Sequence, residues 1–184
     1  MERIPPNRYL IFSLIAIVGC AADLATKAYM FSWPQLQAGE TYWLWEGHIG
    51  WQLSLNEGAL FGMGQGKVWL FATLSVLAAV AIPLWLFWFG AARDLWLTAA
   101  LGGVMAGVLG NLYDRLGLPG EVWPSGPRAG EPVFAVRDWI LWQVNDQWRW
   151  PNFNLADSFL VVGAAILFLR AITQPAVERG RNAD

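Results

Sequence analysis

The chain has 184 residues, of which 56% are hydrophobic and only 14% are charged. That charged fraction is well below the roughly 25% of soluble domains and favours a membrane protein, while a formal net charge of -2 excludes a strongly basic nucleic-acid-binding surface. The single cysteine, Cys20, excludes an internal disulfide, and with a single histidine we expect neither a metal nor another cofactor.

Four apolar segments are long enough to cross a bilayer, which takes about 20 helical residues. We expect these spans at residues 9–30, 68–89, 95–113 and 155–172. The chain length is that of one domain, so we predict a single integral membrane domain over residues 1–184. The predicted fold class is an all-α membrane protein with four transmembrane helices and a small β-containing extracytoplasmic segment.

The first span has an alternative interpretation as a targeting signal. Arg3 and Arg8 precede an apolar run that ends in Gly19-Cys20, which is typical of the cleavage box of a bacterial lipoprotein precursor. However, the run continues beyond Cys20, and three more spans follow it. These features favour a membrane helix.

Two long segments, residues 31–67 and 114–154, connect the spans and fall on one side of the membrane. Residues 41–45 and 48–55 are rich in β-forming residues, which predicts short interfacial strands in the first segment. Lys and Arg are denser on the side of the termini, which places the termini in the cytoplasm and both long segments outside. The 13 Trp residues are typical of a protein with extensive membrane–water interfaces.

Polar residues gather where spans meet the outer interface. Because the spans alternate in direction, these groups face the same side and predict one polar site. The groups are Asp23, Thr26 and Lys27; residues 56–62; residues 110–115; and Asn154 with Asp157.

Each group also has a purely structural interpretation. Asp23 and Lys27 are spaced for a local helical ion pair, and residues 56–62 are spaced for a tight turn with glycine at positive φ. Asn154 and Asp157 are spaced for a capping box at a helix start. Glycines of the third span, such as Gly107, are expected to allow close helix packing.

Asp138 lies in a second polar, Trp-rich stretch. It could be a solvated loop acid, but the apolar residues on both sides favour a buried position on an interfacial strand or helix. An acid at the mouth of an apolar helix, such as Asp157, is costly to place. Two such acids brought together would share one proton, as paired carboxylates do in acid–base catalysis.

Five motifs in this order resemble those of the lipoprotein signal peptidases (signal peptidase II). They are Asp23-Leu24-Ala25-Thr26-Lys27, Asn56 through Gly62, Gly110-Asn111-Leu112-Tyr113-Asp114-Arg115, Val136-Arg137-Asp138-Trp139-Ile140 and Phe153-Asn154-Leu155-Ala156-Asp157-Ser158. The resemblance implies an aspartic endopeptidase of the bacterial cytoplasmic (inner) membrane, with its active site at the outer face. Its expected substrate is diacylglyceryl-modified prolipoprotein, cleaved before the lipidated cysteine.

The resemblance also implies roles for individual residues. It identifies Asp138 and Asp157 as the catalytic pair and implies substrate-binding or supporting roles for Asp23, Lys27, Asn56, Gly58, Asn111, Asp114, Arg115 and Asn154. Among these, we expect Asp114 to hold Arg115. Membrane lipid and prolipoprotein are the expected partners, with no nucleic acid, and a monomer is expected.

The chain departs from the family pattern in two places. Trp139 stands where the family usually has Phe, and an apparent insertion occupies about residues 118–135. The insertion leaves Asp146 as an alternative partner for Asp157. Two other functions remain open: a small ion or proton pathway, which would use intramembrane acids, and a catalytically inactive protein that binds lipoprotein precursors.

Overall fold

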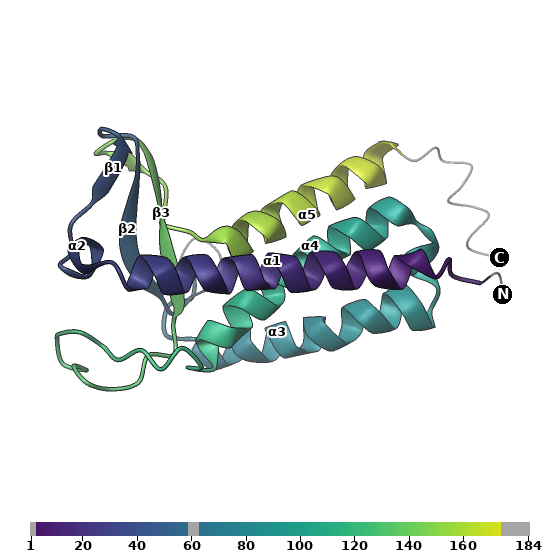
Figure 1. The fold of residues 1–184 in the computed structure, drawn as a ribbon, viewed down its shortest axis with the longest axis horizontal. Coiled ribbons are helices and arrows are strands. Elements are labelled where there is room, and N and C mark those ends of the chain that lie inside the picture. The colour runs from purple at the N-terminus through teal and green to yellow at the C-terminus, as the bar shows by residue number, and fades with distance from the viewer. Residues whose placement is uncertain (1–2, 59–62, 174–184) are drawn as a thin grey trace.

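The computed structural model describes residues 3–58 and 63–173. Within them, four helical segments are long and apolar enough to cross a membrane, as predicted: α1 (Asn7–Phe31), α3 (Val68–Pro83) together with the turn that follows it, α4 (Leu95–Arg115) and α5 (Leu155–Thr173). A π-helical turn, η2 (Leu84–Trp88), extends α3, and the 3-10 turn η3 (Ala91–Arg93) leads into α4. The start of α1 and the end of α5 lie at one end of the bundle, and a small sheet lies at the other (Figure 1).

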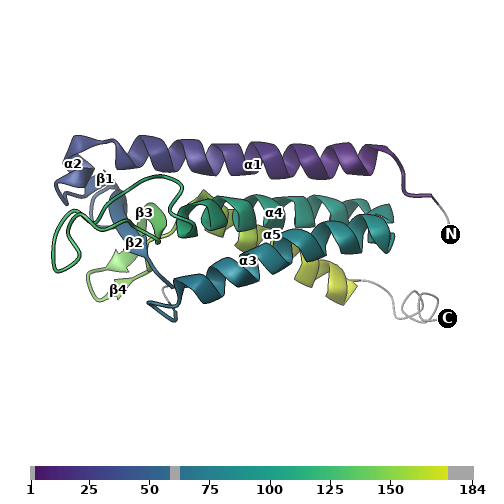
Figure 2. The same cartoon turned by 90° about the horizontal axis from the view of Figure 1, so that it is seen from below.

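Helix α4 is the central helix of the bundle. It lies between α1 and α3 in Figure 2 and also packs on α5. In an apolar stretch of 18 residues in α4, 56% of the residues are buried. The corresponding share in the other three spans is 11–22%. Glycine allows this packing: Gly107 is so close to the carbonyl of Ala156 in α5 that a Cβ would overlap it.

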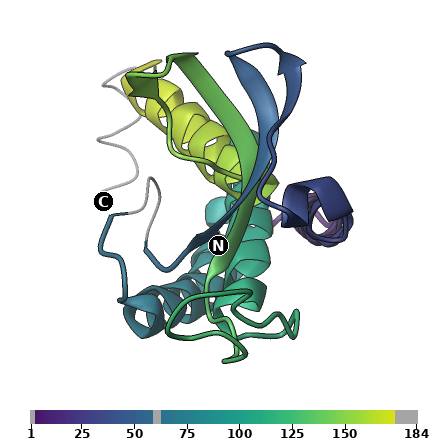
Figure 3. The same ribbon diagram turned by 90° about the vertical axis from the view of Figure 1, so that its left-hand side faces the viewer.

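A four-stranded antiparallel sheet covers the end of the bundle opposite the termini. Its strands are β1 (Tyr42–Trp45), β2 (Ile49–Asn56), β3 (Val136–Asn145) and β4 (Trp148–Arg149), in the order β1-β2-β3-β4. The short helix α2 (Pro34–Gln37) connects α1 to the sheet. The strands predicted in the first long segment are present, and β3 lies beside β2 in the sheet (Figure 3). In the register of this pair, Asp138 lies opposite Ser54.

The insertion forms a hairpin. Val122 bridges Pro132, and the backbone N–H groups of Trp123 and Val133 donate to the carbonyls of Glu131 and Glu121. The hairpin follows the end of α4 and returns the chain to the start of β3, beside the sheet. We call residues 118–135 the insertion hairpin.

Candidate active site

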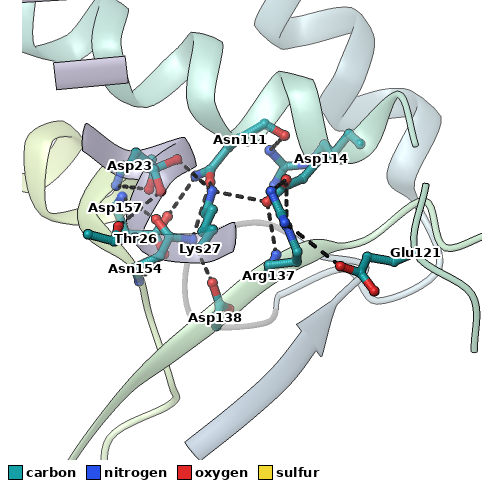
Figure 4. Close-up of polar contacts among 12 residues, drawn as sticks. Asp23, Thr26, Lys27, Asn111, Asp114, Glu121, Arg137, Asp138, Asn154 and Asp157 are labelled. Atoms are coloured by element: carbon teal, nitrogen blue, oxygen red, sulfur yellow. Dashed lines mark hydrogen bonds and ion pairs between the residues drawn. The ribbon is translucent and has the colours of Figure 1, made fainter. Parts of the chain in front are cut away.

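Lys27 is at the centre of a buried polar cluster at the sheet end of the bundle. Its side chain is fully buried, and its Nζ lies 2.8 Å from Asp23 and 3.0 Å from Asp114. It also donates a hydrogen bond of 2.9 Å to Asn111 Oδ1 (Figure 4). The local Asp23–Lys27 ion pair therefore exists, and the contacts of Lys27 with Asp114 and Asn111 connect α1 to α4. Thr26 takes no part, because its hydroxyl donates to carbonyls of its own helix.

The capping box predicted at the start of α5 is present. Asn154 Oδ1 accepts from the backbone N–H of Asp157 at 2.9 Å, and Asp157 Oδ2 accepts from the N–H of Asn154 at 3.3 Å. Asp23 Oδ1 accepts from the N–H of Ala156 at 2.9 Å and completes the cap. The cap uses only one carboxylate oxygen of Asp157, since the other, Oδ1, accepts a hydrogen bond of 2.9 Å from Asn111 Nδ2.

Asp138 enters the cluster from β3 and is 1% exposed, so the solvated-loop interpretation is wrong. Its Oδ1 accepts a hydrogen bond of 2.6 Å from Asn154 Nδ2, which also donates to Asn111 Oδ1 at 3.2 Å. Two amides therefore connect the carboxylates of Asp138 and Asp157.

The environment raises the pKa of Asp138 well above the ordinary value of an aspartate. Burial is the largest cause, and the charge of nearby Asp157 adds to it. Hydrogen bonds from Asn154 and Asn56 and the charge of Lys27 oppose the rise. Asp138 therefore lies in a site that favours its protonated form.

Asp114 does not hold Arg115, contrary to expectation. Asp114 instead accepts from the backbone N–H and Nε of Arg137, both at 3.0 Å, and from its Nη2 at 2.9 Å. Arg115 donates to the carbonyls of Gly58 at 2.9 Å and Asn111 at 3.5 Å. Consecutive helical residues point about 100° apart, so neighbours such as Asp114 and Arg115 do not face each other.

Arg137 was not identified as a site residue from the sequence. It is 4% exposed and follows the buried Val136. A charge within an otherwise buried strand was the available signal, because such a charge needs a partner. The order of the motifs did not reveal that Asp114 is that partner.

The segment that begins at Asn56 starts with a local hydrogen-bonded turn, and the expected glycine at positive φ stays a prediction. Asn56 Oδ1 accepts from the N–H of Gly58 at 2.8 Å and from Gln65 Nε2 at 3.1 Å. Its side chain also hydrogen-bonds Asp138. The remainder of this motif, residues 59–62, lies outside the described part of the chain.

Asp146 lies away from this cluster. It is exposed in the turn between β3 and β4, where it accepts a hydrogen bond from Gln143. The structure brings Asp138, and not Asp146, to the start of α5. Within residues 3–58 and 63–173, no group of three or more His, Cys, Asp or Glu side chains is arranged to hold a metal ion.

Two cavities reach the acids from different sides. A cavity of about 360 Å³ beside the sheet is lined by Asp138, Asn56 and Trp150, among others. A second, of about 200 Å³, lies between α3, α4 and α5 and is lined by Asp157, Arg115, Phe71 and other residues. Small groups can therefore approach the pair from the sheet and from the flank of the bundle.

These features define a multi-pass membrane protein with two bridged, buried aspartates at one end of its helical bundle. The model of the family described as signal peptidase (SPase) II matches residues 15–173, and the chain belongs to this family. A protein named lipoprotein signal peptidase from Rhodopirellula baltica is 50% identical over 91% of this chain and 74% of its own length. One from Pseudomonas fluorescens is 32% identical over 88% of this chain and 85% of its own.

The fold also has a counterpart among solved structures. A bacterial membrane enzyme determined by the in meso method at 1.9 Å has a TM-score of 0.67. The match covers 88% of this chain and 92% of that one, at 24% identity. At this identity the likeness establishes the shared fold and no more.

Proposed function

We propose that the protein is a membrane aspartic endopeptidase that removes the signal peptide from diacylglyceryl-modified prolipoproteins, cleaving before the lipidated cysteine. The observation that carries this proposal is the amide bridge between two buried carboxylates, Asp138 and Asp157. Family membership and the printed name of the relatives, lipoprotein signal peptidase, support the substrate class.

The buried charges support a pair that shares one proton. The described chain buries four acids and three bases: Asp23, Asp114, Asp138 and Asp157, with Lys27, Arg115 and Arg137. The cluster is neutral when one of the four carboxyls is protonated, and an uncompensated buried charge is costly. Asp114 and Asp23 each contact a cation directly, so the proton belongs on the pair formed by Asp138 and Asp157.

A pair with one proton supplies the base and the acid for amide hydrolysis. The ionised carboxylate removes a proton from water as its oxygen attacks the scissile carbonyl, and the protonated carboxyl donates to the carbonyl oxygen. The tetrahedral intermediate then collapses as a proton reaches the leaving nitrogen. The C–N bond breaks to give a carboxylic acid and an amine, and the pair again holds one proton.

The two cavities suggest how the reactants approach. The cavity beside Asp138 has polar lining residues such as Asn56 and Asn152 and suits water. The cavity beside Asp157 is lined largely by apolar side chains, including Phe71 and Leu160, and lies on the flank of the spans. A lipid-modified precursor would reach the pair laterally from the bilayer through this second opening.

The remaining features follow from the substrate. We place residues 1–184 as one integral domain in the bacterial inner membrane, acting as a monomer in contact with lipid. Prolipoproteins are exported before they are processed, so the active site would face outward and the termini would lie in the cytoplasm. The higher density of Lys and Arg on the side of the termini supports this orientation.

The ion-pathway alternative is not favoured by the position of the acids. Asp23 lies toward the sheet end of α1, and Asp157 lies in the first turn of α5. An ion pathway would need such groups through the middle of the bilayer as well.

Cleavage of a diacylglyceryl-modified prolipoprotein by the purified protein tests the proposal. The parent should release the signal peptide, and Asp138→Asn and Asp157→Asn should each be inactive with their folds retained. Asp146→Asn, which removes an exposed acid outside the cluster, is the matched control and should remain active. A parent that binds the precursor without cleaving it would instead support the inactive binding protein.

A further inference from the structure

The insertion hairpin contacts the loop that follows β2. The Arg128 guanidinium donates to both carboxylate oxygens of Glu57, at 2.7 and 3.3 Å. The same guanidinium lies 4.0 Å from the centre of the Trp123 ring. Arg128 and Glu57 are 46% and 21% exposed, so an ordinary pair here would contribute little. The hydrogen bonds to both carboxylate oxygens and the Trp123 ring against the guanidinium hold the Arg128–Glu57 pair more firmly than an ordinary pair.

Glu57 of this ion pair is adjacent in sequence to a residue that contacts the active site. Glu57 precedes Gly58, whose carbonyl accepts the 2.9 Å hydrogen bond from Arg115. That bond is the shorter of the two that the Arg115 side chain makes within the described residues, and its buried Nε makes none. Arg115 interacts electrostatically with Asp157 and Asp138, and it lines the same cavity as Asp157.

The same hairpin approaches the other side of the active site. Glu121 lies 3.9 Å from Arg137, which binds Asp114 and directly precedes Asp138. The hairpin thus contacts the residue before Asp138 and the residue before Gly58. It bridges two segments that are also joined in the sheet by the pairing of β2 and β3.

We propose that the insertion hairpin positions the catalytic groups, and that Arg128 and Glu57 are positioning residues that act on Arg115 through Gly58. The proposal rests on the proposed function, since it concerns the same reaction. Neither side chain is placed at the reacting atoms. Their effect is to fix the Arg115 cation beside the acid pair, where a displacement of about 1 Å can reduce a rate up to about 100-fold.

Steady-state cleavage kinetics of single and paired variants test this role. Arg128→Ala and Glu57→Gln should each lower kcat by about three- to tenfold, with KM within about twofold of the parent, because the pair orients a catalytic-site cation and not the substrate. The exchanged pair, Glu57→Arg with Arg128→Glu, should recover most of the lost kcat. Lys67→Ala, which removes an exposed cation at the start of α3, is the control and should match the parent.

Salt provides a second measurement on the unmodified chain. About 0.5 M salt shortens the Debye length to roughly 4 Å and weakens a half-exposed pair. The parent's kcat should fall toward that of Glu57→Gln, whereas the kcat of Glu57→Gln should change little. Equal salt responses in both proteins would overturn the positioning role.

The results separate this inference from the proposed function. If the parent does not cleave a lipid-modified precursor, the proposed function itself is contradicted. If the parent is active, Asp138→Asn is inactive and Arg128→Ala is unaffected, only the positioning role is contradicted. Variants that raise KM alone would also overturn it, because the hairpin would then be binding substrate.

Discussion

Replacing Asp138 with Asn is expected to abolish cleavage and stabilise the fold. Asp138 is 1% exposed, and its pKa is raised by burial and by Asp157, so its ionised form is costly in the folded state. An amide has nearly the same shape and keeps an oxygen to accept the 2.6 Å hydrogen bond from Asn154. Relief of such an active-site penalty is worth about 0.5–2 kcal/mol of unfolding free energy.

The stabilisation should depend on pH in a defined direction. Between the unfolded pKa of an aspartate and its raised pKa in the fold, the folded parent binds more protons than the unfolded chain, so the parent loses stability as pH rises. Above the raised pKa, Asp138→Asn should be the more stable protein by the full amount. Below the ordinary pKa of an aspartate, the acid is neutral in both states and the advantage should vanish.

Thermal unfolding of detergent-solubilised parent and variant, from about pH 3 to pH 8, measures this difference. A gain of about 1 kcal/mol corresponds to roughly 2–4 °C in Tm for a chain of this size. Cleavage should fall by about 10²–10⁴-fold, because one member of the proposed acid–base pair is lost. A variant that is less stable than the parent by the same amount at every pH would refute the reasoning about Asp138. Retained cleavage would refute its catalytic role.

Three further substitutions test the cluster around the pair. Asn154→Ala should lose about 0.5–2 kcal/mol of stability in urea unfolding, since the helix cap is lost. It should also reduce kcat, because Asp138 and Asp157 lose their amide bridge. An unchanged kcat would contradict the role of the bridge. Gly107→Ala should lower Tm by several degrees, since a Cβ would overlap the α5 backbone, and an unaltered Tm would contradict that close packing. Asp114→Asn should cost about 3–5 kcal/mol, as measured by chemical denaturation, because it removes the carboxylate charge from two buried cations; a loss below 1 kcal/mol would show that water or other groups compensate.

Several parts of the site could be predicted because their signals are local in sequence. Hydrophobic length alone predicts the four spans, and the separation of Asn154 and Asp157 predicts the cap at the start of α5. The alternation of the spans predicts that polar groups far apart in the chain share one side of the membrane. The structure brings Lys27, Asn111 and Asn154 into one cluster of hydrogen bonds there.

Other parts could not be predicted because they depend on contacts between distant segments. The choice of Arg137 over Arg115 as the partner of Asp114 follows from the direction of each side chain and from the position of β3 relative to α4. The contact between Arg128 and Glu57 depends on the path of the insertion hairpin, which its Pro and Gly content does not define.

The sequence by itself therefore determined the helices, their alternation and the residue types available for acid–base chemistry, because these depend on hydrophobic length and local spacing. Only the tertiary structure decided which buried charges face one another. Each charge in a low-dielectric cluster needs a partner within a few ångströms, and such a distance is set by packing between α4, α5 and the sheet. The amide bridge between Asp138 and Asp157 is the main result of that packing.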